Sequence, residues 1–111
     1  MAVTGLCGGS SATPVPERWT PAAIATAGYE AAPSFSADGR EMIYLSADSG
    51  FAGWHLLRSV CGPHGWSAPQ PPSFAAPAPV IEADPGFTPD ANGLYFISAR
   101  HDPANEDFDI Y

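Results

Sequence analysis

Basic residues are scarce in this sequence of 111 residues, which has no lysine and sets only four arginines against 12 acidic residues. The formal net charge at pH 7 is therefore −8. Phosphate backbones and anionic lipids repel a chain of this charge. We therefore expect no nucleic-acid partner.

Long apolar runs are also missing. No stretch approaches the ~20 apolar residues that a membrane-spanning helix needs, so we expect no membrane span. The opening residues, MAVTGLCGGSS, lack the basic start and the apolar core of a signal peptide. The sequence by itself leaves the compartment open.

The chain has two cysteines, Cys7 and Cys61, which can be either free thiols or a disulfide. Cys7 lies in a Gly/Ser tract that we expect to be mobile, and for this reason we expect no bridge between them. The tract also resembles the start of a mature lipoprotein, but Leu6 stands where a small residue is required.

Catalytic motifs are absent as well. The sequence contains no GxSxG, HExxH, GxGxxG or phosphate-loop pattern, and no nucleophile stands beside a base. We therefore expect no catalytic residue, no cofactor site and no metal site, and a protein that is not an enzyme.

Pro and Gly are plentiful, with 13 and 11 copies, and both disfavour long helices. Short strands joined by turns are the expected alternative, so the predicted fold class is all-β. Residues 1–17 are small and polar without a hydrophobic period, which predicts a flexible leader. Structure is expected to begin near Trp19.

Two stretches of the sequence are nearly the same. EAAPSFSADGREMIYLSA at residues 30–47 matches EADPGFTPDANGLYFISA at residues 82–99, with a constant offset of 52 residues. Beyond them the copies drift by two residues, so that residues 53–57 align with 107–111. A fixed period of this size predicts stacked supersecondary units.

Each unit is predicted to contain short strands in an antiparallel meander. In the first unit we expect strands at residues 34–36, 42–45, 54–60 and 66–68. The second unit supplies strands around Phe87, at 94–98 and at 108–111. The apolar run at 42–45 predicts a strand covered on both faces.

Turn chemistry accompanies the first two strands of each unit. Asp38-Gly39 favours a tight turn, because Gly and Asp tolerate positive φ. Ala91 replaces this glycine in the second unit, where Asn92-Gly93 follows two residues later. We expect the second turn to be kept but shifted in register.

These motifs, PSFSADG, MIYLS, PGFTPDA, LYFIS and DIY, resemble the TolB-like β-propeller repeat, a relative of the WD repeats. The resemblance implies four-stranded antiparallel blades of an incomplete propeller over residues 18–111. It divides them into the last strand of a preceding blade (18–29), a complete blade with its linker (30–81) and a half blade (82–111). His55 and Leu57 depart from the repeat pattern. The signature positions, all of them structural, are Pro33, Phe35, Asp38, Gly39, Pro85, Phe87, Asp90, Asp109 and Tyr111.

A propeller closes with at least four blades, so the resemblance implies further blades in a longer chain or self-association of several copies. It also implies a non-catalytic scaffold that binds a protein or peptide, and a place in the periplasm or cell envelope. The alternative is the substrate-gating propeller of a prolyl-oligopeptidase-type serine hydrolase.

Four further groups of residues invite chemical interpretations, each with a structural alternative. Asp102, Glu106, Asp107 and Asp109 could bind calcium, but their spacing favours a solvated loop. Cys61 and His64 have the spacing of half a zinc site, with Cys7, His55 and His101 as the other candidates. Trp19, Trp54 and Trp66 could stack on a sugar, although packing is the simpler interpretation. Glu30 and Glu82 recur at the same place in both units, which favours a scaffold role.

Overall fold

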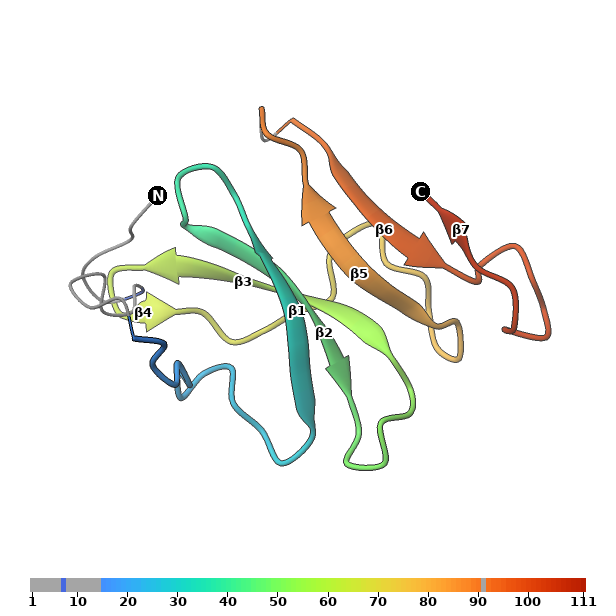
Figure 1. Ribbon diagram of the computed structural model, residues 1–111, viewed down its shortest axis with the longest axis horizontal. Coiled ribbons are helices and arrows are strands. Elements are labelled where there is room, and N and C mark those ends of the chain that lie inside the picture. The colour runs from blue at the N-terminus through green and yellow to red at the C-terminus, as the bar shows by residue number, and fades with distance from the viewer. Residues whose placement is uncertain (1–6, 8–14, 91) are drawn as a thin grey trace.

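The computed structural model describes Cys7 and residues 15–90 and 92–111, and throughout these residues the regular elements are strands (Figure 1). The all-β prediction is confirmed for this part of the chain. No helix within it is long and apolar enough to cross a membrane. The strands are β1 (Tyr29–Phe35), β2 (Glu41–Ala47), β3 (His55–Gly62), β4 (Gly65–Trp66), β5 (Glu82–Phe87), β6 (Leu94–Ser98) and β7 (Asp109–Ile110).

The strands form two antiparallel sheets, and within each sheet the strands pair in the order of the sequence. The first sheet has the order β1-β2-β3-β4 and the second the order β5-β6-β7. Short connections allow only antiparallel pairing, so the predicted meander is confirmed. Figure 1 shows the second sheet lying beside the first, with the linker between β4 and β5 passing from one to the other.

The β1–β2 and β5–β6 hairpins share the same irregularity. Each has a register shift at the corresponding place, where Ala32 and Asp84 adopt positive φ values of 49° and 53°. Pro33 and Pro85 follow directly, and a β-bulge tolerates proline because the ladder is interrupted there. The bulge breaks the alternation of β1, which is why the sequence pattern indicated only its last residues.

The turn of the first hairpin is built around Asp38, as predicted. Its carboxylate accepts hydrogen bonds from the Ser36 hydroxyl at 2.7 Å and from the Arg40 backbone N–H at 3.0 Å. Gly39 has a φ of 70°, a conformation that costs glycine little. The turn therefore accounts for both the aspartate and the glycine.

The second turn corrects the sequence prediction of a shifted register. Asp90 accepts hydrogen bonds from the Thr88 hydroxyl at 2.5 Å and the Asn92 backbone N–H at 3.1 Å. These are the positions 52 residues after their counterparts in the first turn. The register is kept because the aspartate sets this turn, and Asn92-Gly93 does not form a separate one.

The core lies on both faces of β2. Met42 and Tyr44 belong to one buried cluster, whereas Ile43 packs with Leu56 and Phe96 in another. Alternate side chains of a strand point to opposite faces, so this run needs a cover on each side. The prediction of a strand covered on both faces is confirmed.

The two covers differ in kind. The second sheet covers one face of the first through Phe96, and the segment before β1 covers the opposite face through Trp19 and Ile24. Residues 18–28 contain no strand; they include a turn at 22–24, with the Ile24 N–H donating to the Pro21 carbonyl at 2.9 Å. The structure therefore differs from the expected last strand of a preceding blade over 18–29.

Cys7 and Cys61 form a disulfide with a Cα–Cα distance of 6.1 Å, so the expectation that no bridge joins them is wrong. Cys7 is buried, and its carbonyl accepts a hydrogen bond from the Trp66 indole at 3.1 Å. The Gly/Ser composition around Cys7 gave no indication of these two contacts. The predicted leader over residues 1–17 otherwise lies mostly outside the described residues.

Removal of this disulfide tests how much the covering segment depends on it. We expect the Cys7→Ser/Cys61→Ser double variant to lose about 2 to 4 kcal/mol of unfolding free energy, because the bridge restricts the unfolded chain. Urea denaturation followed by tryptophan fluorescence measures the change. Dithiothreitol should shift the wild type to the same midpoint and leave the variant unmoved. An unchanged midpoint in the double variant would contradict this role.

Candidate functional site

A cleft of about 420 Å³ combines apolar walls with fixed polar groups. One wall is the Pro- and Ala-rich linker at residues 71–80, and the other is the start of β3 with Trp54 and His55. We call this cleft the loop-end groove. Its lining is mainly apolar, as is usual for ligand sites on proteins.

An ion pair with a buried carboxylate fastens the linker to the second sheet. Glu82, which lines the groove, is only 1% exposed. Its Oε2 accepts hydrogen bonds from Arg100 Nη2 at 2.5 Å and Nε at 3.2 Å, while Oε1 accepts the Ala76 backbone N–H at 2.8 Å. A carboxylate this buried needs such partners, so the pair holds the groove wall in place.

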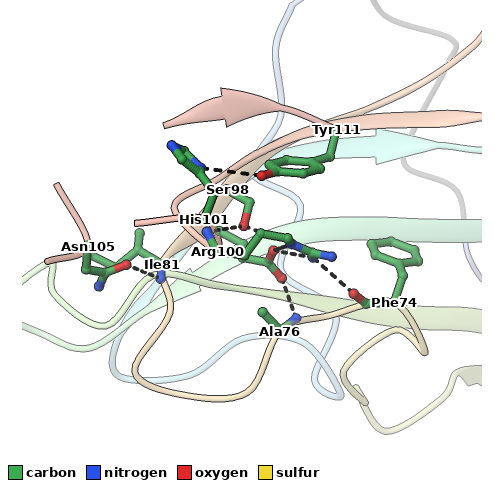
Figure 2. Close-up of polar contacts among 9 residues, drawn as sticks. Phe74, Ala76, Ile81, Ser98, Arg100, His101, Asn105 and Tyr111 are labelled. Atoms are coloured by element: carbon green, nitrogen blue, oxygen red, sulfur yellow. Dashed lines mark hydrogen bonds and ion pairs between the residues drawn. The ribbon is translucent and has the colours of Figure 1, made fainter. Parts of the chain in front are cut away.

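The Arg100 side chain has further partners besides Glu82, among them the Phe74 carbonyl (Figure 2). The guanidinium carbon lies 5.2 Å from the centre of the Phe96 ring and 5.1 Å from that of Tyr111. Arg100 also donates a hydrogen bond to the Phe74 carbonyl at 3.1 Å. Aromatic faces attract the cation, so the rings add to the pairing with Glu82.

Asn105 ties down the other end of the linker. Its Oδ1 accepts the Ile81 backbone N–H at 2.9 Å (Figure 2). Its Nδ2 donates to the Pro79 carbonyl at 2.9 Å. Asn105 lies in the β6–β7 loop and has a φ of 60°, which asparagine tolerates well. The linker is therefore held by side chains of the second sheet at two points.

Asp102 organises the β6–β7 loop. Its carboxylate accepts backbone N–H groups from Ala104, Glu106 and Asp107 at 3.1, 2.9 and 3.0 Å. These hydrogen bonds hold the pKa of Asp102 below its ordinary value. Of the calcium candidates, Asp102 thus stabilises the loop through these hydrogen bonds. Among the described residues, no group of three His, Cys, Asp or Glu side chains converges to hold a metal.

The remaining chemical candidates do not meet at one place. Oxidation removes Cys7 and Cys61 as thiolate ligands for zinc. Trp19 and Trp66 pack edge to face with ring centres 6.0 Å apart, whereas Trp54 packs against Phe51. The three tryptophans therefore form no common platform.

The signature residues of the sequence pattern lie in bulges, turns and packing contacts. Phe35 packs against Trp19, Phe87 packs on the Phe96 cluster, and Tyr111 stacks on Phe96. The bulges are followed by Pro33 and Pro85, and the turns contain Asp38, Gly39 and Asp90. Asp109 lies opposite Ser98 in the β6–β7 pairing. None of them lines the loop-end groove.

Sequence reasoning did not find the residues that build the groove. Arg100, Asn105 and the linker carried no motif, although Glu82 was noted as a repeated residue. The one available signal was the small number of arginines. A glutamate that is buried needs a cationic partner, and the chain has only four arginines to supply it. The packing of the sheets determines which arginine pairs with Glu82.

The chain matches no protein-family model, no curated protein and no solved structure. The likeness to TolB-like repeats is therefore an interpretation of its motifs. The function has to be inferred from the geometry of the chain itself.

Substitution of Arg100 tests whether the buried pair braces the site. We expect Arg100→Met to lower the unfolding free energy by about 3 kcal/mol, because Glu82 keeps a buried charge without its guanidinium. The matched control is Arg58→Met, which breaks the more exposed pair with Glu41 and should cost less than about 1 kcal/mol. Urea denaturation compares the two variants. Equal losses would contradict the bracing role.

The turn aspartates predict a dependence of stability on acid. Hydrogen bonds hold the pKa of Asp38, Asp90 and Asp102 below the ordinary 3.8, chiefly from the Ser36 hydroxyl, the Thr88 hydroxyl and backbone N–H groups respectively. Since the folded pKa lies below the unfolded value, the stabilisation is present above pH 3.8 and is lost as the pH falls through the folded pKa.

We therefore expect the unfolding temperature to drop below pH 3.8, and to drop less steeply in the Asp38→Asn/Asp90→Asn/Asp102→Asn variant. Differential scanning calorimetry over a pH series measures this. Glu106→Gln, a change at an exposed residue of the same loop, should keep the wild-type slope. An equally steep decline in the triple variant would show that these turns do not set the acid response.

Proposed function

We propose that this chain is a non-catalytic binding scaffold built from two successive units of the β-propeller type, and that it receives a protein or peptide segment in the loop-end groove. The observation that carries the proposal is the groove itself, an apolar cleft of about 420 Å³ with a wall fixed at two points. Loops held on a rigid frame are common binding surfaces. A prepared groove also lowers the ordering cost of binding.

The matched hairpins support the propeller arrangement. Both have the same register, the same bulge and the same aspartate-centred turn. The second sheet packs on one face of the first, which is how successive repeats cover one another. Tyr95 and Ile110 on the second sheet are 61% and 73% exposed, and there a further unit of a longer chain or of another copy would pack.

The lining of the groove indicates what kind of segment it receives. Prolines and alanines of the linker line the groove together with Trp54 and His55, and the one acidic lining residue, Glu82, is already paired with Arg100. Such a surface favours an apolar side chain on an extended peptide over a charged small molecule. The aromatic ring of Trp54 supplies the largest contact area.

A random peptide library displayed on phage tests the proposal. We expect selection against the wild-type chain to enrich peptides with an apolar residue, and synthetic copies to bind in a titration followed by fluorescence anisotropy. Ala78→Phe fills the groove from an exposed lining position and should weaken binding at least about tenfold.

Ala68→Phe is the matched control, because Ala68 is also exposed but does not line the groove. It should bind the selected peptides as the wild type does. A library that yields no binder, or binders indifferent to Ala78→Phe, would rule out the groove as the binding site.

A further inference from the structure

Glu30 and Glu82 occupy the same position in their hairpins. Glu30 pairs with Ser46 across β1–β2, and Glu82 pairs with Ser98 across β5–β6. In each hairpin an aromatic residue stands two positions before the serine, Tyr44 in the first and Phe96 in the second. Residues two apart share a face of a strand, so each glutamate lies on the same face as an aromatic ring.

The second hairpin completes this arrangement with a cation. The guanidinium of Arg100 pairs with Glu82 and lies 5.2 Å from the Phe96 ring centre. The position two residues after the serine, filled by Arg100 in the second hairpin, is Asp48 in the first. Asp48 faces its own turn, where it accepts the Gly50 N–H at 2.9 Å.

Glu30 has no such counter-charge. Among the described residues the ion pairs of arginine and histidine go to other acids, and the hydrogen bond to the Glu30 carboxylate comes from the Thr26 hydroxyl. Beside Glu30 is a cleft of about 180 Å³ between the N-terminal segment and the first sheet, lined also by Trp19, Met42 and Tyr44. That volume is several times the ~30 Å³ that one water occupies in the liquid.

The glutamate and the phenol lie within electrostatic reach of each other in this cleft. Burial raises the pKa of Tyr44 to about 12, and the negative charge of Glu30 adds to the rise. Near pH 7 Tyr44 is therefore an uncharged phenol, and the Glu30 carboxylate is the acidic group that lines the cleft. The cleft therefore offers an anionic wall, an aromatic wall and space, which are the elements that surround Arg100 in the other hairpin.

We propose that the cleft beside Glu30 binds a guanidinium cation, held by the Glu30 carboxylate against the partly buried ring of Trp19. A guanidinium is planar, so it can donate two hydrogen bonds to one carboxylate and stack on a ring at the same time. An ammonium is a hydrated point charge, so it can donate hydrogen bonds to the carboxylate but has no planar face to stack on the ring. The guanidinium belongs to a free small molecule or to an arginine side chain of a peptide.

This site is separate from the loop-end groove, because the two clefts share no lining residue. Binding at either site can therefore fail without the other. The net charge of −8 favours a cationic ligand in general, whereas the cleft specifies its shape.

Isothermal titration calorimetry with N-acetyl-L-arginine amide as the probe tests the proposal. We expect saturable binding, which the neutral isostere N-acetyl-L-citrulline amide and the ammonium analogue N-acetyl-L-lysine amide both weaken by at least about tenfold. This comparison uses the wild-type chain and depends on no variant.

Glu30→Gln should weaken binding of the arginine probe by at least about tenfold, since it removes the charge and keeps an acceptor for Thr26. Glu106→Gln, in the exposed β6–β7 loop, is the matched control and should bind as the wild type does. Thermal unfolding of both variants checks that they fold.

A blocked Gly-Arg-Gly tripeptide separates the two sources of the ligand. Tighter binding of the tripeptide than of the amide assigns the site to an arginine side chain of a peptide, and weaker binding assigns it to a free guanidinium compound. Absence of saturable binding by either probe overturns the proposal. Equal binding of the arginine, citrulline and lysine probes, or full affinity in Glu30→Gln, overturns it as well.

Discussion

A strand that is apolar on both faces cannot be left in water, and β2 is such a strand. Its residues Met42 and Tyr44 point one way and Ile43 points the other, and all three are buried. Two covers are therefore required. The second sheet provides one, and the N-terminal segment, fastened by the disulfide, provides the other. Both clefts described above lie where these covers meet the first sheet.

The two hairpins show how one backbone plan carries different chemistry. Bulge, register and turn are the same in both, since they depend on φ values and on aspartate hydrogen bonds. The charges around them differ. Glu82 is buried with Arg100 and braces the linker, whereas Glu30 borders a cleft that no described arginine enters. The glutamate at this position thus braces the scaffold in the second hairpin, whereas in the first hairpin its carboxylate is available to a ligand.

Parts of the fold were predictable because their causes are close together in the sequence. The strand at 94–98 was predicted with its observed bounds, and the Asp38 turn was predicted with its residues. The start of β1 was missed, because the bulge at Ala32 interrupts the alternation that identifies a strand. The strand expected within 18–29 does not form before Tyr29, because apolar residues of this segment cover a sheet without joining it.

The sequence by itself determined the all-β class, the offset between the two hairpins and the chemistry of their turns, because strand alternation and turn hydrogen bonds act over a few residues. Tertiary structure alone decided that Cys7 reaches Cys61 over a separation of 54 residues. It also decided that Arg100 forms an ion pair with Glu82 and that Asn105 donates a hydrogen bond to the Pro79 carbonyl. The same packing leaves both clefts open. These contacts depend on how the two sheets and the N-terminal segment pack, and no local pattern encodes that packing.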